Sequence, residues 1–100
     1  MDTPPNLETV RRAVSAVIDA WDLYGFIEGG APSNEYDIES YLIAYRIGDI
    51  RSASDTARVV SDVFLEKLGL DIPPEDAAQI GEQLFAKLRE ADLLEAPSTL

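Results

Sequence analysis

Apolar residues recur along the chain at intervals of three, four and seven positions, which is the spacing that places side chains on one face of an α-helix. In the first such segment they are Leu7, Val10, Val14, Val17, Ile18 and Trp21. Asn6 stands just before the segment as a suitable N-cap, and Glu8 lies where the positive end of a helix dipole favours an acid. The pattern therefore predicts a helix over 7–22 whose apolar stripe faces the core.

The second segment, 38–47, is apolar on two sides. Ile38, Tyr41, Leu42 and Tyr45 share one side, and Ile43 and Ile47 lie roughly opposite. Because a helix with two apolar sides is buried on both, this segment is predicted to be the central helix, with both of its tyrosines in the core. Asp37 is its predicted N-cap, Glu39 lies in its first turn, and Gly48 follows its end.

The third helix is predicted over 55–68. Its apolar stripe is formed by Ala57, Val60, Phe64 and Leu68. Ser54, or Ser52 with Asp55 three residues later, is the predicted N-cap. Gly69 is predicted to end the helix, because glycine tolerates the left-handed conformation found there.

The fourth helix is predicted over 74–93, beginning at Pro74 because proline is favoured at the first helical position. Its apolar face is Ala77, Ile80, Leu84, Leu88 and Ala91. No strand pattern and no internal repeat competes with this reading. The sequence therefore predicts an all-α fold: one compact four-helix domain over 1–100, with a long structured loop between the first two helices and a flexible tail over 95–100.

The charge is strongly biased, with 19 acids against eight bases and a net charge of −11. Phosphate backbones would repel such a chain, so no nucleic-acid partner is expected, whereas a protein with a basic surface would be attracted. The bias is segmental, since neither 13–45 nor 68–86 contains a base. Solubility alone would also explain an acidic excess, and the composition does not separate the two readings.

Cysteine and histidine are both missing from the sequence. Disulfides, zinc sites built on thiolates and catalytic dyads or triads that need either residue are therefore excluded. The first residues, MDTPPNLE, lack the basic and apolar segments of a secretory signal, and no apolar run is long enough to span a membrane. We expect a cytoplasmic protein with no membrane association and no cofactor.

One stretch carries a family resemblance. Its residues are Trp21, Asp22, Tyr24 and Gly25, then Gly30, Ala31 and Pro32, then Glu35, Tyr36, Asp37 and Glu39. This pattern resembles the signature of the YugE-like family of small, acidic, all-helical bacterial proteins, and the similarity extends from 7 to 91. The resemblance implies an all-helical fold and no chemistry, because the family has no assigned biochemical activity. The chain departs from the family at Leu23 and Ile38, where the family tends to have proline.

The loop between the first two predicted helices contains the candidate partner-binding residues. Tyr24, Glu28, Glu35 and Tyr36 combine aromatic rings with carboxylates, which is a composition suited to binding arginine and lysine. The leading hypothesis is therefore a non-catalytic protein-binding module, in a specific version an immunity-like or antitoxin-like protein that masks a basic surface such as that of a nuclease. Trp21 is predicted to have a structural role.

A second hypothesis, of a different class, uses the same region for a metal-dependent activity or a metal sensor. Its ligands would be Asp19, Asp22, Glu35, Asp37 and Glu39, which offer Mg²⁺ or Ca²⁺ oxygen atoms alone. Capping and dipole interactions explain Asp37 and Glu39 without any metal. A homo-oligomer assembled through the loop is a third possibility.

Overall fold

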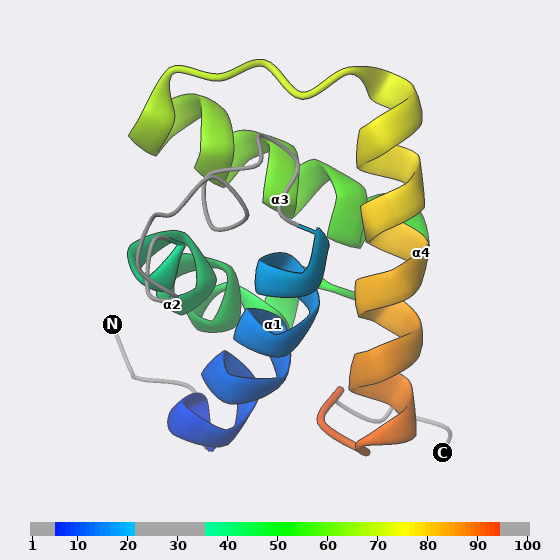
Figure 1. The fold of residues 1–100 in the computed structure, drawn as a ribbon. Coiled ribbons are helices and arrows are strands. Elements are labelled where there is room, and N and C mark those ends of the chain that lie inside the picture. Colours follow the sequence, from blue (N-terminus) through cyan, green and yellow to red (C-terminus); the bar gives the residue numbers. More distant parts are fainter. Residues whose placement is uncertain (1–5, 22–35, 95–100) are drawn as a thin grey trace.

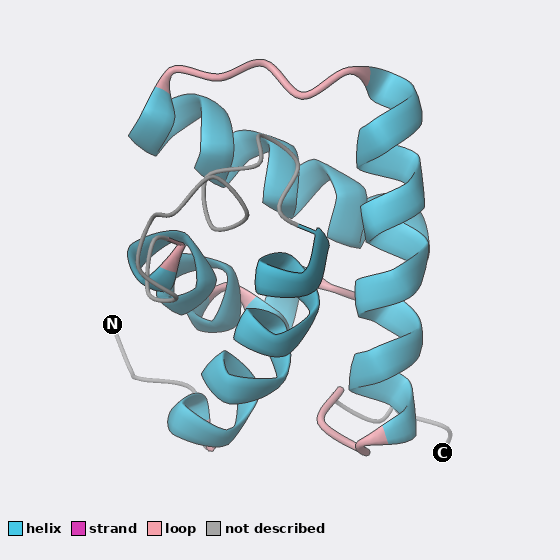
Figure 2. Ribbon diagram, in the orientation of Figure 1, coloured by secondary structure: helices cyan, strands magenta, loops and turns pink. Residues whose placement is uncertain are grey.

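The computed structural model describes residues 6–21 and 36–94 (Figure 1). They form α1 (Leu7–Trp21), α2 (Asp37–Tyr45), the 3₁₀ turn η1 (Ile47–Asp49), α3 (Ala53–Leu68) and α4 (Pro74–Glu90). No strand occurs among these residues, as Figure 2 shows. The prediction of an all-α, four-helix domain is confirmed. The predicted loop between the first two helices and the predicted tail over 95–100 lie outside the described residues.

The four helices form a closed ring of neighbouring pairs. α1 packs on α2 and on α4, and α3 packs on the same two helices, with its longest contact along α4. Figure 1 shows α4 upright along one side, α3 crossing above α1, and α2 below the C-terminal half of α3. The core lies in the middle of the ring, where Val14, Ile18, Ile43, Phe64 and Leu84 are completely buried.

The long helices bury the faces that their spacing predicts. In α1 the buried residues are Val10, Val14 and Ile18, and in α4 they include Ala77, Ile80, Leu84 and Leu88. α4 ends at Glu90, three residues before the predicted end, and Asp92 just beyond it has a left-handed φ of 57°. Ala91 is therefore an exposed residue after the helix, and the prediction that it extends the apolar face is wrong.

Both ends of α3 are fixed by local sequence. The hydroxyl oxygen of Ser52 accepts a hydrogen bond from the amide of Asp55 at 3.0 Å, and the Asp55 carboxylate accepts one from the amide of Arg51 at 3.1 Å. This reciprocal capping starts the helix at Ala53, two residues earlier than predicted. At the other end Gly69 takes the predicted left-handed conformation, with φ of 65°.

α2 differs most from its prediction. Ile38 is 66% exposed and Tyr41 is 42% exposed, so half of the side predicted to be in the core faces outward. Leu42 and Tyr45, on the same predicted side, are half-buried. The opposite face is buried, with Ser40, Ile43 and Ala44 inside. α2 packs on α1 and α3 through one face, so the prediction of a central helix buried on two sides is wrong.

The contact between α3 and α4 depends on Gly81, a glycine whose role in packing no sequence pattern predicts. A Cβ atom on Gly81 would lie 2.7 Å from the carbonyl oxygen of Ala53 and 2.8 Å from the Cβ of Ala57. Neither position accepts another carbon atom without a backbone shift, because real contacts of this kind are longer. Gly81 therefore sets how closely the start of α3 can approach the middle of α4.

Candidate functional site

The structure describes only one of the four predicted partner-binding residues. Tyr24, Glu28 and Glu35 lie outside the described residues. Tyr36 is described, and it is only 1% exposed, with its ring stacked on Phe64 at a centroid distance of 6.0 Å. The prediction that Tyr36 faces a partner is therefore wrong. The residue before α2 fills the core, and an isolated tyrosine on a predicted loop gave no periodicity from which burial could be inferred.

The residues of the family-like signature are mostly structural where they are described. Trp21, at the end of α1, meets the Phe64 ring edge-on at a centroid distance of 5.9 Å. Because Tyr36 stacks on the same ring, the end of α1 and the start of α2 are both anchored on α3. Asp22, Gly25, Gly30 and Pro32 lie outside the described residues.

Asp37 has a different role from the predicted cap. It is the first residue of α2, and the N-cap position before it is Tyr36, whose side chain makes no capping hydrogen bond. The Asp37 carboxylate instead accepts a hydrogen bond from Nη1 of Arg11 at 2.8 Å. The capping prediction is wrong because the nearest donor to this carboxylate is a guanidinium on α1, which fastens the outer edge of α1 to the start of α2.

Arg11 also binds an acid on its own helix. Its Nη2 lies 2.7 Å from Glu8 Oε1, and its Nε lies 3.2 Å from Glu8 Oε2. The hydrogen bond from Arg11 lowers the pKa of Glu8 below its ordinary value and raises the pKa of Arg11 in turn. One base therefore joins acids from two helices, in the region where the sequence suggested an unopposed negative surface.

The metal hypothesis has little support in the described part of the site. Glu39 lies in the first turn of α2 as predicted but is only 4% exposed, and Asp37 is held by Arg11. Among residues 6–21 and 36–94, no three acids are grouped in a way that would hold a metal ion. Two of the five proposed ligands, Asp22 and Glu35, lie outside these ranges.

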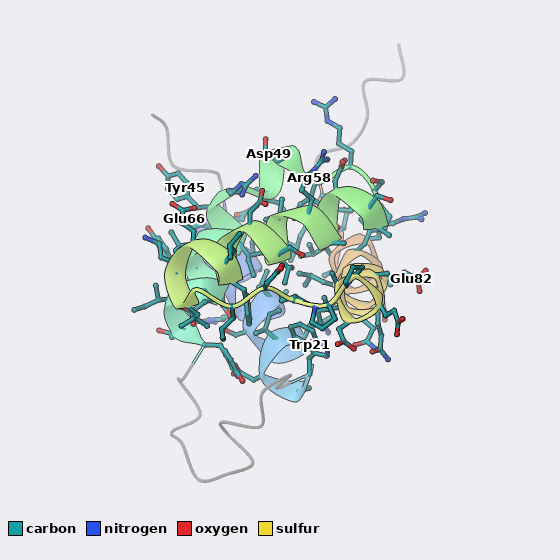
Figure 3. All side chains as sticks on the ribbon, turned by 90° about the horizontal axis from the view of Figure 1, so that it is seen from above. Trp21, Tyr45, Asp49, Arg58, Glu66 and Glu82 are labelled. Carbon is teal, nitrogen blue, oxygen red and sulfur yellow. The ribbon has the colours of Figure 1, made fainter. Side chains whose placement is uncertain are left out.

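An exposed apolar surface runs over α2 and the end of α3. We call it the α2–α3 surface, and it consists of the exposed Ile38, Tyr41, Leu65 and Leu68 and the half-buried Tyr45. The Tyr41 and Tyr45 rings lie 6.2 Å apart, and Leu65 is 54% exposed. Figure 3 shows Tyr45 and Glu66 at the same end of the molecule, where α2 passes beneath α3. Leu68 was predicted to belong to the core, which is wrong, since its side chain is 39% exposed.

The acids divide into paired and unpaired groups. Glu8, Asp37, Asp49, Asp55 and Asp62 form ion pairs with arginines. A second group makes no ion pair within the described part of the chain: Glu66, Asp71, Glu75, Asp76, Glu82, Glu90 and Asp92. The second group begins beside the α2–α3 surface and continues over the connection to α4 and along α4. The excess negative charge is therefore exposed on this part of the molecule.

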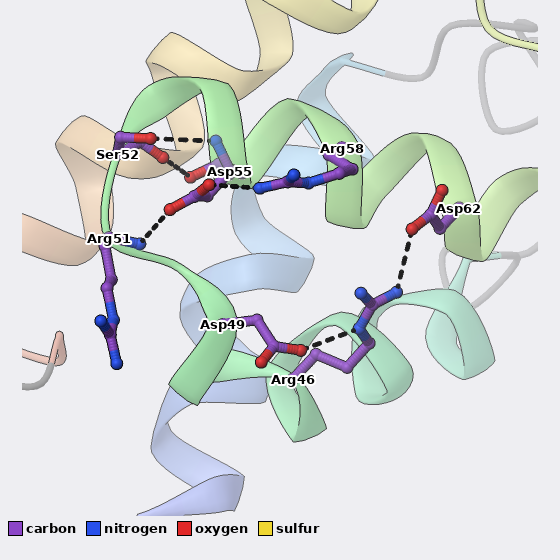
Figure 4. A network of polar contacts seen from close by, with 8 residues as sticks. Arg46, Asp49, Arg51, Ser52, Asp55, Arg58 and Asp62 are labelled. Atoms are coloured by element: carbon purple, nitrogen blue, oxygen red, sulfur yellow. Dashed lines mark hydrogen bonds and ion pairs between the residues drawn. The ribbon is translucent and has the colours of Figure 1, made fainter.

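A polar network occupies the junction between η1 and the first half of α3 (Figure 4). Arg46 contacts Asp49 through Nε at 3.3 Å and Asp62 through Nη1 at 3.5 Å. Arg58 is hydrogen-bonded to Asp55, the acid that also caps α3. The network borders a cavity of about 420 Å³. Sequence reasoning missed this place, although three of the eight bases fall between 46 and 58, which was a usable signal.

The fold and surface together define an acidic, all-α four-helix protein with an exposed apolar patch. No protein-family model matches the chain, and no curated protein or solved structure matches it either. None of the helices in the described ranges is both long enough and apolar enough to cross a bilayer.

Proposed function

We propose that this protein is a non-catalytic, acidic module that binds another protein presenting a basic surface. The observation that supports the proposal best is the α2–α3 surface, because Ile38, Tyr41 and Leu65 are large apolar side chains that the fold leaves in water. Exposed apolar side chains that lie together on a surface are typical of a binding site, and Tyr41 and Tyr45 lie side by side. The segment 22–35, which includes Tyr24, Glu28 and Glu35, precedes α2 directly and belongs to the proposed contact region.

The tyrosines suit such a contact. Tyr41 and Tyr45 lie ring beside ring, and tyrosine offers a large apolar face together with a hydroxyl that finds a partner when buried. Aromatic anchors of this kind contribute a large share of the free energy of many protein interfaces. We therefore place the centre of the proposed contact on these two rings and the exposed Ile38.

The negative charge of this chain supports a partner with a basic surface. The chain carries a net charge of −11, and the acids from Glu66 to Glu82 have no ion-pair partner among the described residues. Such a field speeds the encounter with a basic partner and disfavours acidic competitors. The proposal predicts that rising salt slows association more than it speeds dissociation, since screening acts mainly on the encounter.

The specific version of the proposal is an immunity-like or antitoxin-like protein in the cytoplasm that masks a basic surface on a toxin. Small size, acidity and the absence of cysteine and histidine from the sequence agree with this version. Membership of the YugE-like family is a separate proposal, which rests on the signature residues between Trp21 and Glu39. The metal-dependent alternative on Asp19, Asp22, Glu35, Asp37 and Glu39 stays a prediction. A thermal-shift scan with Mg²⁺, Mn²⁺ and Ca²⁺ tests it, because an ion that binds the native state raises the unfolding temperature.

The test of the protein-binding proposal compares two matched variants. Ile38→Asp adds a charge to the α2–α3 surface, and Gln79→Asp adds the same charge to an exposed position of α4. We expect wild type and Gln79→Asp to capture the same protein from native extract at low salt, and Ile38→Asp to lose it. Capture of nothing by wild type, or equal capture by all three proteins, would contradict the proposal. Light scattering of the wild type alone separates self-association from binding to a different protein.

A further inference from the structure

A cavity at the junction of η1 and α3 is lined by more basic than acidic side chains. Its lining is Arg46, Gly48, Asp49, Arg51, Arg58 and Val59. Two further acids, Asp62 and Asp55, pair with Arg46 and Arg58 and balance the charge of the network. The capacity of the cavity to bind an anion therefore depends on the guanidinium donors that these ion pairs leave available.

The three guanidinium groups keep most of their donors available. Arg46 uses two nitrogen atoms on Asp49 and Asp62, and Arg58 uses one on Asp55. The side chain of Arg51 makes no ion pair with any described residue. Since a guanidinium carries five N–H donors, the three groups together retain more donors than they use.

The existing ion pairs are of a kind that an incoming anion displaces easily. The contacts of Arg46 are long, at 3.3 Å and 3.5 Å, and the carboxylates of Asp49 and Asp62 are more than half exposed to water. Exposed ion pairs of this type contribute little to stability. Asp55, by contrast, is held by the backbone amide of Arg51, so it keeps Arg58 in position at the rim of the cavity.

We infer that this cavity binds a phosphate group carried by a small molecule, that is, a phosphate monoester. A dianionic phosphate accepts paired hydrogen bonds from guanidinium groups, and arginine matches that geometry better than lysine does. The volume of about 420 Å³ lies within the range of small-molecule sites and exceeds what a bare phosphate needs. Val59 is buried and Gly48 has no side chain, which leaves room for an uncharged organic portion beside the phosphate.

This inference does not depend on the proposed protein partner, since no residue of the α2–α3 surface lines the cavity. The test uses the full chain, labelled with ¹⁵N and followed by amide and arginine Nε chemical shifts. Inorganic phosphate, glycerol phosphate and chloride are titrated separately at constant ionic strength. We expect saturable shifts from Arg46 to Val59 with both phosphates and none with chloride.

The test is made specific by Arg51→Gln and its control Arg12→Gln, and a third variant, Arg51→Lys, refines it. Arg51→Gln removes a fully available guanidinium and is expected to weaken phosphate binding about tenfold, which corresponds to the loss of one charge-assisted hydrogen bond. Arg12→Gln removes the same charge from an exposed position on α1 and is expected to leave binding unchanged. Arg51→Lys keeps the charge but lacks the planar, forked set of guanidinium donors. Its affinity for phosphate is therefore expected to lie between those of wild type and Arg51→Gln.

The inference is overturned by shifts that do not saturate, by equal effects of Arg51→Gln and Arg12→Gln, or by chloride acting as strongly as phosphate. Tighter binding of glycerol phosphate than of inorganic phosphate supports the monoester, whereas equal binding supports recognition of the phosphate group alone. All three variants change exposed side chains, and the dispersion of their amide spectra confirms that each has folded.

Discussion

The α3–α4 pair and the α1–α2 pair join two helices by different means. Where α3 meets α4, Gly81 brings backbone against backbone, with the Ala53 carbonyl and the Ala57 methyl group within van der Waals reach. Where the outer edges of α1 and α2 meet, a long side chain spans the distance, from Arg11 to Asp37. Ile38, the next residue of α2, is left in water.

The difference indicates a division of tasks within a small domain. A close backbone approach tolerates no change of volume, so the α3–α4 pair is suited to holding the fold. An exposed ion pair adjusts easily and contributes little free energy, so α2 is suited to presenting side chains to another molecule. The comparison predicts that substitutions at the α3–α4 contact cost more stability than breaking the ion pair at the edge of α2.

The largest expected effect comes from Phe64, where both halves meet. Phe64→Ala removes a fully buried ring that contacts Trp21 and Tyr36, and we expect it to lower the free energy of unfolding by about 3–5 kcal/mol. Urea unfolding followed by circular dichroism measures this. Phe85→Ala, at a half-buried position of α4, is the matched control and should cost clearly less. Equal losses would mean that Phe64 does not join the two halves.

Gly81→Ala is expected to have the next largest effect. In an exposed helix the change would stabilise by about 1 kcal/mol, but the added methyl group meets the Ala53 carbonyl and Ala57. Overpacking of this kind typically costs about 1–3 kcal/mol, so we expect a net loss of stability. Thermal unfolding of Gly81→Ala beside Gln79→Ala, an exposed change on the same helix, gives the comparison. A stabilised Gly81→Ala protein would show that α3 and α4 can separate freely.

Breaking the ion pair between α1 and α2 should matter less. Asp37→Asn removes the charge that faces Arg11 and keeps the shape of the side chain. We expect the free energy of unfolding to fall by no more than about 1 kcal/mol, since the pair is partly exposed and Arg11 keeps its ion pair with Glu8. Denaturant unfolding at low and high salt tests this, and the loss should shrink as salt rises. A loss as large as that of Phe64→Ala would remove the distinction between the two pairs.

The smallest effect is the contribution of Glu8 as a function of pH. The hydrogen bond from Arg11 makes the pKa of Glu8 lower in the folded protein than in the unfolded chain. The contribution is therefore present above the unfolded pKa of about 4.3 and is lost as pH falls through the folded value. The difference in unfolding free energy between wild type and Glu8→Gln should be constant near neutral pH and vanish in acid. A difference that grows as pH falls would contradict this sign.

The sequence predicts the parts of the fold in which a single periodicity acts over several turns. Val10, Val14 and Ile18 in α1, and Ile80 and Leu84 in α4, repeat often enough to define one face, and that face is buried. Local chemistry also predicts where α3 ends, and it offers Ser52 as one of two candidate caps for its start. Ser52 carries a side-chain acceptor for a free amide, and Gly69 takes a conformation that other residues avoid.

The parts that failed depend on packing between distant segments. α2 has only nine residues, which are too few for its apolar pattern to indicate one buried side. The side that is buried in the structure carries the small residues Ser40 and Ala44. Tyr36 and Gly81 are buried by residues far along the chain, and no local pattern encodes that. The candidate sites were predicted least accurately. Tyr36 was predicted to lie on the surface but is buried, and the arginines between 46 and 58 were not predicted to form a site.

The shared use of Phe64 by Trp21 and Tyr36 has a consequence for changes in the connection between them. The two ends of the segment 22–35 are fixed at one ring, so insertions or replacements within it need not move either helix. Doubling the length of a flexible closed segment costs only about 0.6 kcal/mol, which a folded domain can absorb. A change in the length of this connection is therefore expected to leave the packing of Trp21 and Tyr36 on Phe64 in place.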